Sequence, residues 1–235
     1  MQPAIEISGL TKRYGKGDAS VEALKGVDMT VAPGEVIGLI GPSGSGKSTL
    51  LKCLGAVIEP TSGHMALAGE TIYDGGWRVT DLRALRRDRI GFVFQAPYLI
   101  PFLDVTDNVA LLPMLAGARN GKARELARDM LAALDVGHRA QAQVSELSGG
   151  EQQRVSIARA LVNQAPIVLA DEPTAPLDSE RAMTVIRLLN EMARRFQTAI
   201  VVVTHDEKII PTFRRIYRIR DGRTYEEAGE GRAVE

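Results

Sequence analysis

The sequence has few of the residues on which several classes of protein depend. Its 235 residues include one cysteine, one tryptophan and three histidines, and 5% of them are aromatic. The single cysteine, Cys53, excludes an intrachain disulfide framework and a zinc module built on several cysteines. Basic and acidic residues are equal in number, at 29 each, so no overall positive field would hold nucleic acid. We therefore expect no nucleic-acid partner.

Long apolar segments are also absent. No run approaches the roughly 20 apolar residues that span a bilayer, and the N-terminus lacks the basic and then apolar pattern of a signal peptide. We expect a cytoplasmic chain whose attachment to a membrane comes only through partner subunits. The composition, 45% hydrophobic and 25% charged, is otherwise ordinary for a globular protein, and the length suits one domain of residues 1–235.

A glycine-rich segment, 41–49, fits the phosphate-binding pattern G-x-x-x-x-G-K-[ST]. It follows an apolar run of strand length, 35–40, and precedes a helical segment, 48–56, as the pattern requires. Glycine lets the backbone approach a phosphate chain, and the start of a helix favours an anion. A turn that merely carries a lysine is the alternative, and it leaves the flanking strand and helix unexplained. We expect a nucleoside triphosphate to bind at Gly41, Pro42, Ser43, Gly44, Ser45, Gly46, Lys47, Ser48 and Thr49.

Two of these residues have expected roles in phosphate chemistry. Lys47 is expected to reach the β- and γ-phosphates, and the Ser48 hydroxyl to ligate Mg²⁺. Ahead of the loop, residues 4–31 read as a β-rich lobe that carries Tyr14. The ring of Tyr14 could stack on a purine base, although a half-buried strand tyrosine explains the same residue.

The middle of the chain changes from strand-like to helical sequence patterns. Residues 90–94 form a short apolar strand that ends in Gln95, at the position where α/β sheets bind ligands. We expect Gln95 to face a metal ion or water, with a plain edge amide as the alternative. No strand-like run occurs between 104 and 165, so we expect a helical subdomain (about 96–165) inserted into a core of 1–95 and 166–225. Residues 226–235 are polar, and we expect this tail to be frayed.

Within the helical region, Ser148 and Glu151 form the sequence pattern of a capping box. A capping box alone would mark only the start of a helix. Here Gly149 and Gly150 leave the backbone N–H groups of the first turn uncovered, and such groups bind anions. We therefore expect a second phosphate-recognition element at Ser148, Gly149, Gly150 and Glu151.

Two further apolar strands are followed by residues that can take part in phosphate chemistry. Asp171 and Glu172 follow the strand 167–170, where an aspartate holds Mg²⁺ in phosphate-loop enzymes and the neighbouring glutamate can polarise an attacking water. Two acids at a solvated strand end are the alternative. His205 follows the strand 198–203. Its side chain either contacts a γ-phosphate or lies in the core with its hydrogen bonds made by neighbouring residues.

These motifs, in this order, resemble the ATP-binding subunit of ABC transporters, whose signature is matched by residues 147–152. The resemblance implies an α/β phosphate-loop ATPase core (RecA-like) with an N-terminal antiparallel β lobe and an inserted α-helical subdomain. It also implies ATP and Mg²⁺ as cofactors. The implied roles are base stacking for Tyr14, Mg²⁺ sensing for Gln95, a metal-site carboxylate for Asp171, general base for Glu172, γ-phosphate switch for His205 and a cofactor contact for Asp178.

In this family two ATPase subunits pair head to tail, so that Ser148 and Gly150 of one copy close over the triphosphate held by the other. The finer resemblance is to the lipoprotein-release, macrolide-export and heterocyst glycolipid exporter group. It is carried by residues 94–95, 104–109, 112–113 and 204–206, and it departs from the group at Pro176 in the loop 174–178.

The resemblance implies an ATPase on the cytoplasmic face of the inner membrane, bound to transmembrane permease subunits with a periplasmic adaptor. These partners would export or extract a lipid, lipoprotein, glycolipid or drug. An ATPase that transmits force to periplasmic proteins without moving a substrate is the alternative. We expect the permease to dock on the loop 96–104, through an exposed Tyr98, Leu99 and Phe102, or else this loop packs locally.

Overall fold

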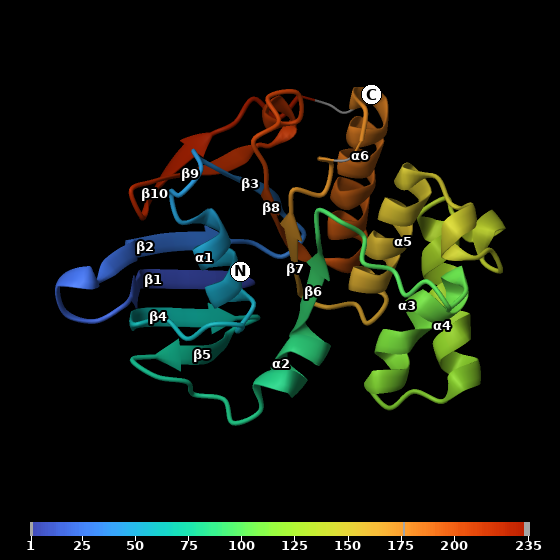
Figure 1. The fold of residues 1–235 in the computed structure, drawn as a ribbon, viewed down its shortest axis with the longest axis horizontal. Coiled ribbons are helices and arrows are strands. Elements are labelled where there is room, and N and C mark those ends of the chain that lie inside the picture. The colour runs from blue at the N-terminus through green and yellow to red at the C-terminus, as the bar shows by residue number, and fades with distance from the viewer. Residues whose placement is uncertain (1, 176, 233–235) are drawn as a thin grey trace.

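The first sheet is a four-stranded antiparallel lobe in the order β2-β1-β4-β5 (Figure 1). The computed structural model describes residues 2–175 and 177–232. The strands of the lobe are β1 (Ile5–Tyr14), β2 (Val21–Val31), β4 (Ser62–Leu67) and β5 (Glu70–Asp74). Ile5 is paired with Val31 on one side and with Leu67 on the other. All three side chains are buried, because alternate residues of a strand share one face.

The second sheet has six strands in the order β10-β9-β3-β8-β7-β6. Its strands are β3 (Val36–Ile40), β6 (Ile90–Val93), β7 (Ile167–Asp171), β8 (Ala199–Val203), β9 (Arg215–Arg220) and β10 (Arg223–Ala228). All neighbouring pairs are parallel except β9 with β10. Every residue of β3 and β8 is buried, which is why these strands read as continuous apolar runs.

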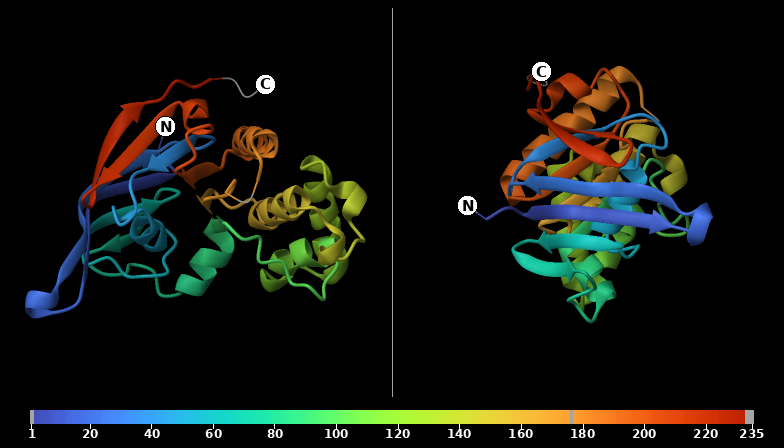
Figure 2. Two further views of the ribbon diagram at one scale, coloured as in Figure 1. Left: turned by 45° about the horizontal axis from the view of Figure 1, so that its top comes forward. Right: turned by 90° about the vertical axis from the view of Figure 1, so that its left-hand side faces the viewer.

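Helices cover both faces of this sheet (Figures 1 and 2). The helices are α1 (Lys47–Leu54), α2 (Leu82–Arg89), α3 (Val105–Leu115), α4 (Asn120–Ala133), α5 (Gly149–Leu161) and α6 (Ser179–Phe196). Short 3₁₀ turns lie at η1 (Gly17–Ala19), η2 (Gly137–Arg139), η3 (Val144–Glu146) and η4 (Ile210–Thr212). In Figure 1, α3, α4 and α5 gather at the end of the molecule away from the antiparallel lobe.

The core divides into two clusters, one on each face of the six-stranded sheet. Val36 and Ile40 of β3 pack with the cluster that contains residues of α5 and α6. Ile37 and Leu39 pack with the cluster that contains α1 and the antiparallel lobe. Cys53 belongs to this second cluster, and burial raises the pKa of its thiol to about 12. The thiol is therefore a packing group at neutral pH.

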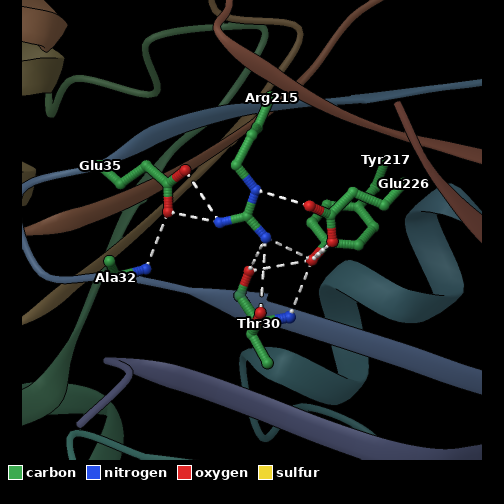
Figure 3. A network of polar contacts seen from close by, with 6 residues as sticks. All are labelled: Thr30, Ala32, Glu35, Arg215, Tyr217 and Glu226. Carbon is green, nitrogen blue, oxygen red and sulfur yellow. Dashed lines mark hydrogen bonds and ion pairs between the residues drawn. The ribbon is translucent and has the colours of Figure 1, made fainter. Parts of the chain in front are cut away.

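A polar network joins the antiparallel lobe to the edge of the six-stranded sheet (Figure 3). The guanidinium of Arg215 donates to both carboxylate oxygens of Glu35 at 2.9 Å and to Glu226 at 3.0 Å. It also donates to the carbonyl oxygen of Thr30 at 3.1 Å and to the hydroxyl of Tyr217 at 2.7 Å. Burial opposes the charge of Arg215, but the two carboxylates more than offset burial and raise its pKa.

Two local expectations need correction. Residues 226–228 are not frayed: they form the end of β10, where Glu226 pairs with Arg215 and Glu227 with Arg218. Leu99 is not exposed: it is half-buried against the helical cluster. The last residues of the predicted tail, 233–235, lie outside the described part. Among the described residues, none of the helices combines the length and the apolar character that crossing a membrane requires.

Candidate nucleotide site

The carboxyl ends of the parallel strands bring most of the predicted site residues to one edge of the six-stranded sheet. Leu39 of β3 is level with Val203 of β8, and Val203 is level with Asp171 of β7. On the other side of β7, Val93 of β6 is level with Ala170. The segments after these strands carry the phosphate loop, His205, Glu172 and Gln95. This edge is where parallel α/β sheets bind ligands.

Two glycines of the phosphate loop occupy places that a side chain could not. A Cβ atom on Gly41 would lie 2.2 Å from the carbonyl oxygen of Ile219, and one on Gly46 would lie 2.7 Å from that of Ala23. Gly46 also has φ of +111°, in the region that favours glycine. The loop is thus closely packed between Ala23 of β2 and Ile219 of β9.

Lys47 folds back over this loop from the first turn of α1. Its ammonium donates to the carbonyl oxygens of Gly41 at 2.6 Å and Pro42 at 2.8 Å. The N-cap residue Gly46 has no side chain to cap the helix, so the first N–H groups of α1 lack helical partners. The Ser45 hydroxyl is buried and makes no hydrogen bond with any described residue. A positive charge and free N–H groups at one loop suit a phosphate chain.

Glu172 and His205, predicted separately, meet at the same edge. The Oε1 atom of Glu172 lies 2.6 Å from Nδ1 of His205. The glutamate side chain is 16% exposed and the imidazole 75% exposed. Glu172 has φ of +50°, which is uncommon for a residue with a side chain, and such conformations gather at functional sites. Its N–H donates to the carbonyl oxygen of Val203, so β8 holds the backbone of Glu172 in this unusual conformation.

Asp171 lies between opposing charges. Burial raises the pKa of its carboxyl, and the neighbouring Glu172 raises it further, while the ammonium groups of Lys47 and Lys52 oppose the shift. The described residues contain no group of three or more acidic, histidine or cysteine side chains that could hold a metal ion by itself. Mg²⁺ does not need one, because it binds one or two protein carboxylates together with phosphate oxygens and water. The oxygen donors of Asp171, Ser48 and Gln95 therefore fit this ion.

Gln95 and Tyr14 lie at the margins of this site. Gln95 is exposed, two residues beyond the end of β6. Tyr14 ends β1 and is paired with Val21 of β2, two residues from Ala23, which adjoins the phosphate loop. Its ring is 42% exposed, with the Lys12 ammonium 5.2 Å from the ring centre. Figure 2 shows this hairpin projecting from the body of the molecule.

The signature segment does not join the other site residues. The capping box is confirmed: the carboxylate of Glu151 accepts from the N–H of Ser148 at 2.7 Å, and the Ser148 hydroxyl accepts from the N–H of Glu151 at 3.4 Å. Glu151 also pairs with Arg139. Ser148 and Gly149 are exposed. However, α5 packs on the face of the sheet opposite to α1 (Figures 1 and 2).

Asp178, predicted to contact the cofactor, is exposed and caps α6. Its carboxylate accepts from the N–H of Arg181 at 2.9 Å and pairs with the guanidinium of the same residue at 3.3 Å. Pro176, where the sequence departs from the resembled group, lies outside the described part. Thr174, in the same loop, has a buried hydroxyl that no described residue hydrogen-bonds.

The structure adds a residue that sequence reasoning missed. Arg159 of α5 donates to the carbonyl oxygens of Pro97 at 2.7 Å and Tyr98 at 2.8 Å. Gln153, on the same helix, donates to the carbonyl oxygen of Phe94 at 3.4 Å. The segment on either side of Gln95 is thus tied to the signature helix. In the sequence, Arg159 is one arginine among many, and only the tertiary contact distinguishes it.

Comparison with known proteins identifies this arrangement. The family model described as "ABC transporter" matches residues 24–175. The lipoprotein-releasing system ATP-binding protein LolD of Geobacter metallireducens is 42% identical over 95% of this chain and 98% of that protein. The macrolide export ATP-binding/permease protein MacB of Hyphomonas neptunium is 41% identical over 99% of this chain, which spans 36% of that protein.

A solved structure gives the same result for the fold. An ATP-binding cassette, solved as a dimer in a post-hydrolysis state with ADP and Pi, has a TM-score of 0.82 and 36% identity over 97% of this chain and 99% of its own. The predicted fold class is therefore confirmed, as is the resemblance to the lipoprotein-release and macrolide-export group. The chain belongs to the ABC transporter family and contains its ATP-binding and ATP-hydrolysing domain.

Proposed function

We propose that two copies of this chain close head to tail around ATP and part after its hydrolysis. The observation that carries the proposal is the separation of the two phosphate-recognition elements. The phosphate loop and α1 lie on one face of the six-stranded sheet, while α5, with Ser148 at its start, packs on the other. A second copy can supply the missing half, and a two-fold axis completes both sites together. A similar ATP-binding cassette was solved as a dimer in a post-hydrolysis state with ADP and Pi, which supports a two-copy assembly.

Within each site, different residues would bind the nucleotide, hold the metal ion and activate the water. Lys47 and the N–H groups of the loop hold the phosphates, and Tyr14 receives the base. Ser48, Asp171 and Gln95 hold Mg²⁺, which supplies charge neutralisation at the phosphates when bound. Glu172 accepts a proton from the attacking water. His205 orients the Glu172 carboxylate through their 2.6 Å contact and, being exposed, can also contact the γ-phosphate.

The loop 96–104 is the proposed docking surface for a permease subunit, and Phe94 lies just before it. Phe94, Tyr98 and Phe102 are 41%, 70% and 81% exposed. Phe94 stacks with Phe92 and meets Tyr98 edge to face, with ring centres 5.8 and 5.7 Å apart. An exposed aromatic row of this kind suits a partner helix. This surface would hold the chain on the cytoplasmic face of the inner membrane.

The cargo follows from the relatives alone. One relative is named for lipoprotein release and others for macrolide export, so we propose export or extraction of a lipid, lipoprotein, glycolipid or drug. A periplasmic adaptor would complete such a system. The second candidate, force transmission to periplasmic proteins without transport, uses the same residues, and a transport assay with the permease separates the two.

The test of the closed dimer is the mass of the Glu172→Gln variant in sedimentation velocity. With saturating Mg-ATP we expect this variant to sediment as a dimer, because ATP stays bound between the copies. The Lys47→Ala/Glu172→Gln double variant should remain monomeric under the same conditions. The proposal fails if Glu172→Gln stays monomeric with Mg-ATP even when the permease is present.

A further inference from the structure

A pocket of about 770 Å³ lies at the edge of the six-stranded sheet opposite to the nucleotide site. Its wall includes Val36, the first residue of β3, whereas the phosphate loop follows Ile40 at the other end of that strand. The turn before β3, one flank of α6, the start of β9 and residues after β10 complete the wall. The volume is within the range of small-molecule sites, roughly 300–1,000 Å³.

The charge of this wall is strongly one-sided. Five arginines line the pocket, against a single acidic residue, Glu35: they are Arg187, Arg194, Arg214, Arg215 and Arg232. Glu35 and Glu226 both pair with Arg215 (Figure 3), and Glu230 pairs with Arg232. In the described part of the chain, no carboxylate lies within 4.0 Å of the guanidinium of Arg194 or Arg214. These two cations come from different elements, α6 and the residue before β9.

Arg194 and Arg214 are both exposed to solvent, and both line this one pocket. Along α6, Arg187 and Arg194 are two helical turns apart and both line the pocket, so they share a flank of the helix. Arg214 faces the same space from the start of β9. Like charges in one pocket repel each other, and an anion relieves this repulsion.

We propose that this pocket binds a phosphate-bearing anion at Arg194 and Arg214. The planar guanidinium fork matches phosphate geometry and can donate two parallel hydrogen bonds to it. A phosphate group offers several acceptor oxygens, so it can bridge the two side chains. The phosphate belongs either to a small soluble molecule or to the headgroup of an anionic lipid. In both cases the site is separate from the ATP site, because the two lie at opposite ends of β3.

The experiment titrates the protein with two probes while ADP saturates the nucleotide site. Inorganic pyrophosphate, followed by calorimetry, tests the soluble source. Vesicles of phosphatidylglycerol in phosphatidylcholine, followed by co-sedimentation, test the lipid source. We expect one probe to bind and the Arg194→Ala/Arg214→Ala variant to lose about tenfold or more in affinity, as expected from losing two charged hydrogen-bond donors.

The matched control is Arg195→Ala/Arg128→Ala, which removes the same charge elsewhere. Arg195 adjoins Arg194 on α6 but lies over the Phe196 ring, and Arg128 is exposed on α4. The control should bind as the parent does, and thermal melts should show both double variants folded. The proposal is overturned if neither probe binds the parent, if both double variants lose affinity equally, or if only Lys47→Ala abolishes binding.

Discussion

The imidazole of His205 lies 2.6 Å from the carboxylate of Glu172, although 33 residues separate them in the chain. The contact exists because β7 and β8 are parallel neighbours in register, with Asp171 level with Val203. Each strand places its next residues beyond the same sheet edge. The carboxylate of Glu172 thus contacts an imidazole that is itself open to solvent.

The first prediction concerns Glu172. Replacing it with glutamine keeps the size of the side chain and removes its ability to accept a proton. Turnover of Mg-ATP should fall by about 10²–10⁴, the usual contribution of a general base, and ATP affinity should stay close to that of the parent. Phosphate release and nucleotide titration measure the two quantities.

Two comparisons sharpen this test. Lys47→Ala should lose affinity for ATP as well as turnover, because the Lys47 ammonium is the positive charge over the phosphate loop. Glu180→Gln changes an exposed glutamate in the first turn of α6 and should leave both quantities unchanged. Near-parental turnover in Glu172→Gln would show that another group is the base.

The second prediction concerns Arg159, which holds the segment after Gln95 through two backbone carbonyls. In Arg159→Ala the amides of residues 94–100 should exchange hydrogen about tenfold faster or more, because a lost charged hydrogen bond weakens local order by roughly 1.5–3 kcal/mol. Arg159→Lys, which keeps the charge but not the fork, should lie between parent and alanine variant.

Hydrogen exchange followed by mass spectrometry gives this measurement peptide by peptide. Arg128→Ala removes an exposed arginine on another helix of the same unit and serves as the control. Unchanged exchange over 94–100 in Arg159→Ala would mean that α5 does not order this segment.

How far sequence reasoning reached depended on the range of the interaction. The phosphate loop, the capping box at Ser148 and the strand ends at Asp171 and His205 are written in local patterns, and the structure places each on the expected element. The contact of Arg159 with Pro97 spans 62 residues and leaves no local pattern. The arginine pocket was missed for the same reason, since its wall comes from four separate segments.

Charge composition also misled in one respect. The tail from Glu226 reads as polar and frayed, but Glu226 and Glu227 pair across to Arg215 and Arg218 of β9. Arginines on one strand and acids on the next can pair across an antiparallel edge. Polarity alone cannot distinguish such an edge from a disordered tail, because the partner strand decides which of the two forms.

The third prediction concerns Glu151, whose carboxylate caps the start of the signature helix. The backbone N–H of Ser148 is the main cause that lowers the pKa of this carboxyl below its ordinary 4.5. A lowered pKa means that the stabilisation is present above the ordinary value and is lost as the pH falls through the folded-state value. Glu151→Ala should therefore lose about 1 kcal/mol at neutral pH, the typical value of a helix cap, and less in acid.

Urea unfolding of parent and variant at neutral pH and at about pH 3.5 measures this difference. Glu151→Gln keeps an acceptor oxygen but cannot ionise, so its stability relative to Glu151→Ala should not change between the two pH values. If the free energies of unfolding of the parent and Glu151→Ala differ by the same amount at both pH values, the charge of Glu151 does not stabilise the helix.

The last prediction separates binding from folding at Asp171. Burial and the charge of Glu172 raise the pKa of this carboxyl, so its ionised form is favoured less in the folded chain than in the unfolded chain. The sign is opposite to that of Glu151: Asp171 favours folding at acid pH and disfavours it as the pH rises through its raised pKa. Asp171→Asn should therefore raise the melting temperature at neutral pH without Mg²⁺ and nucleotide.

Mg-ATP should raise the melting temperature of the parent, because a ligand that binds only the folded chain stabilises it. It should raise the melting temperature of Asp171→Asn less. Asp129→Asn, on the exposed side of α4, should match the parent in both measurements. A variant that is less stable without ligand would show that Asp171 makes a favourable contact in the folded chain, contrary to its electrostatic surroundings.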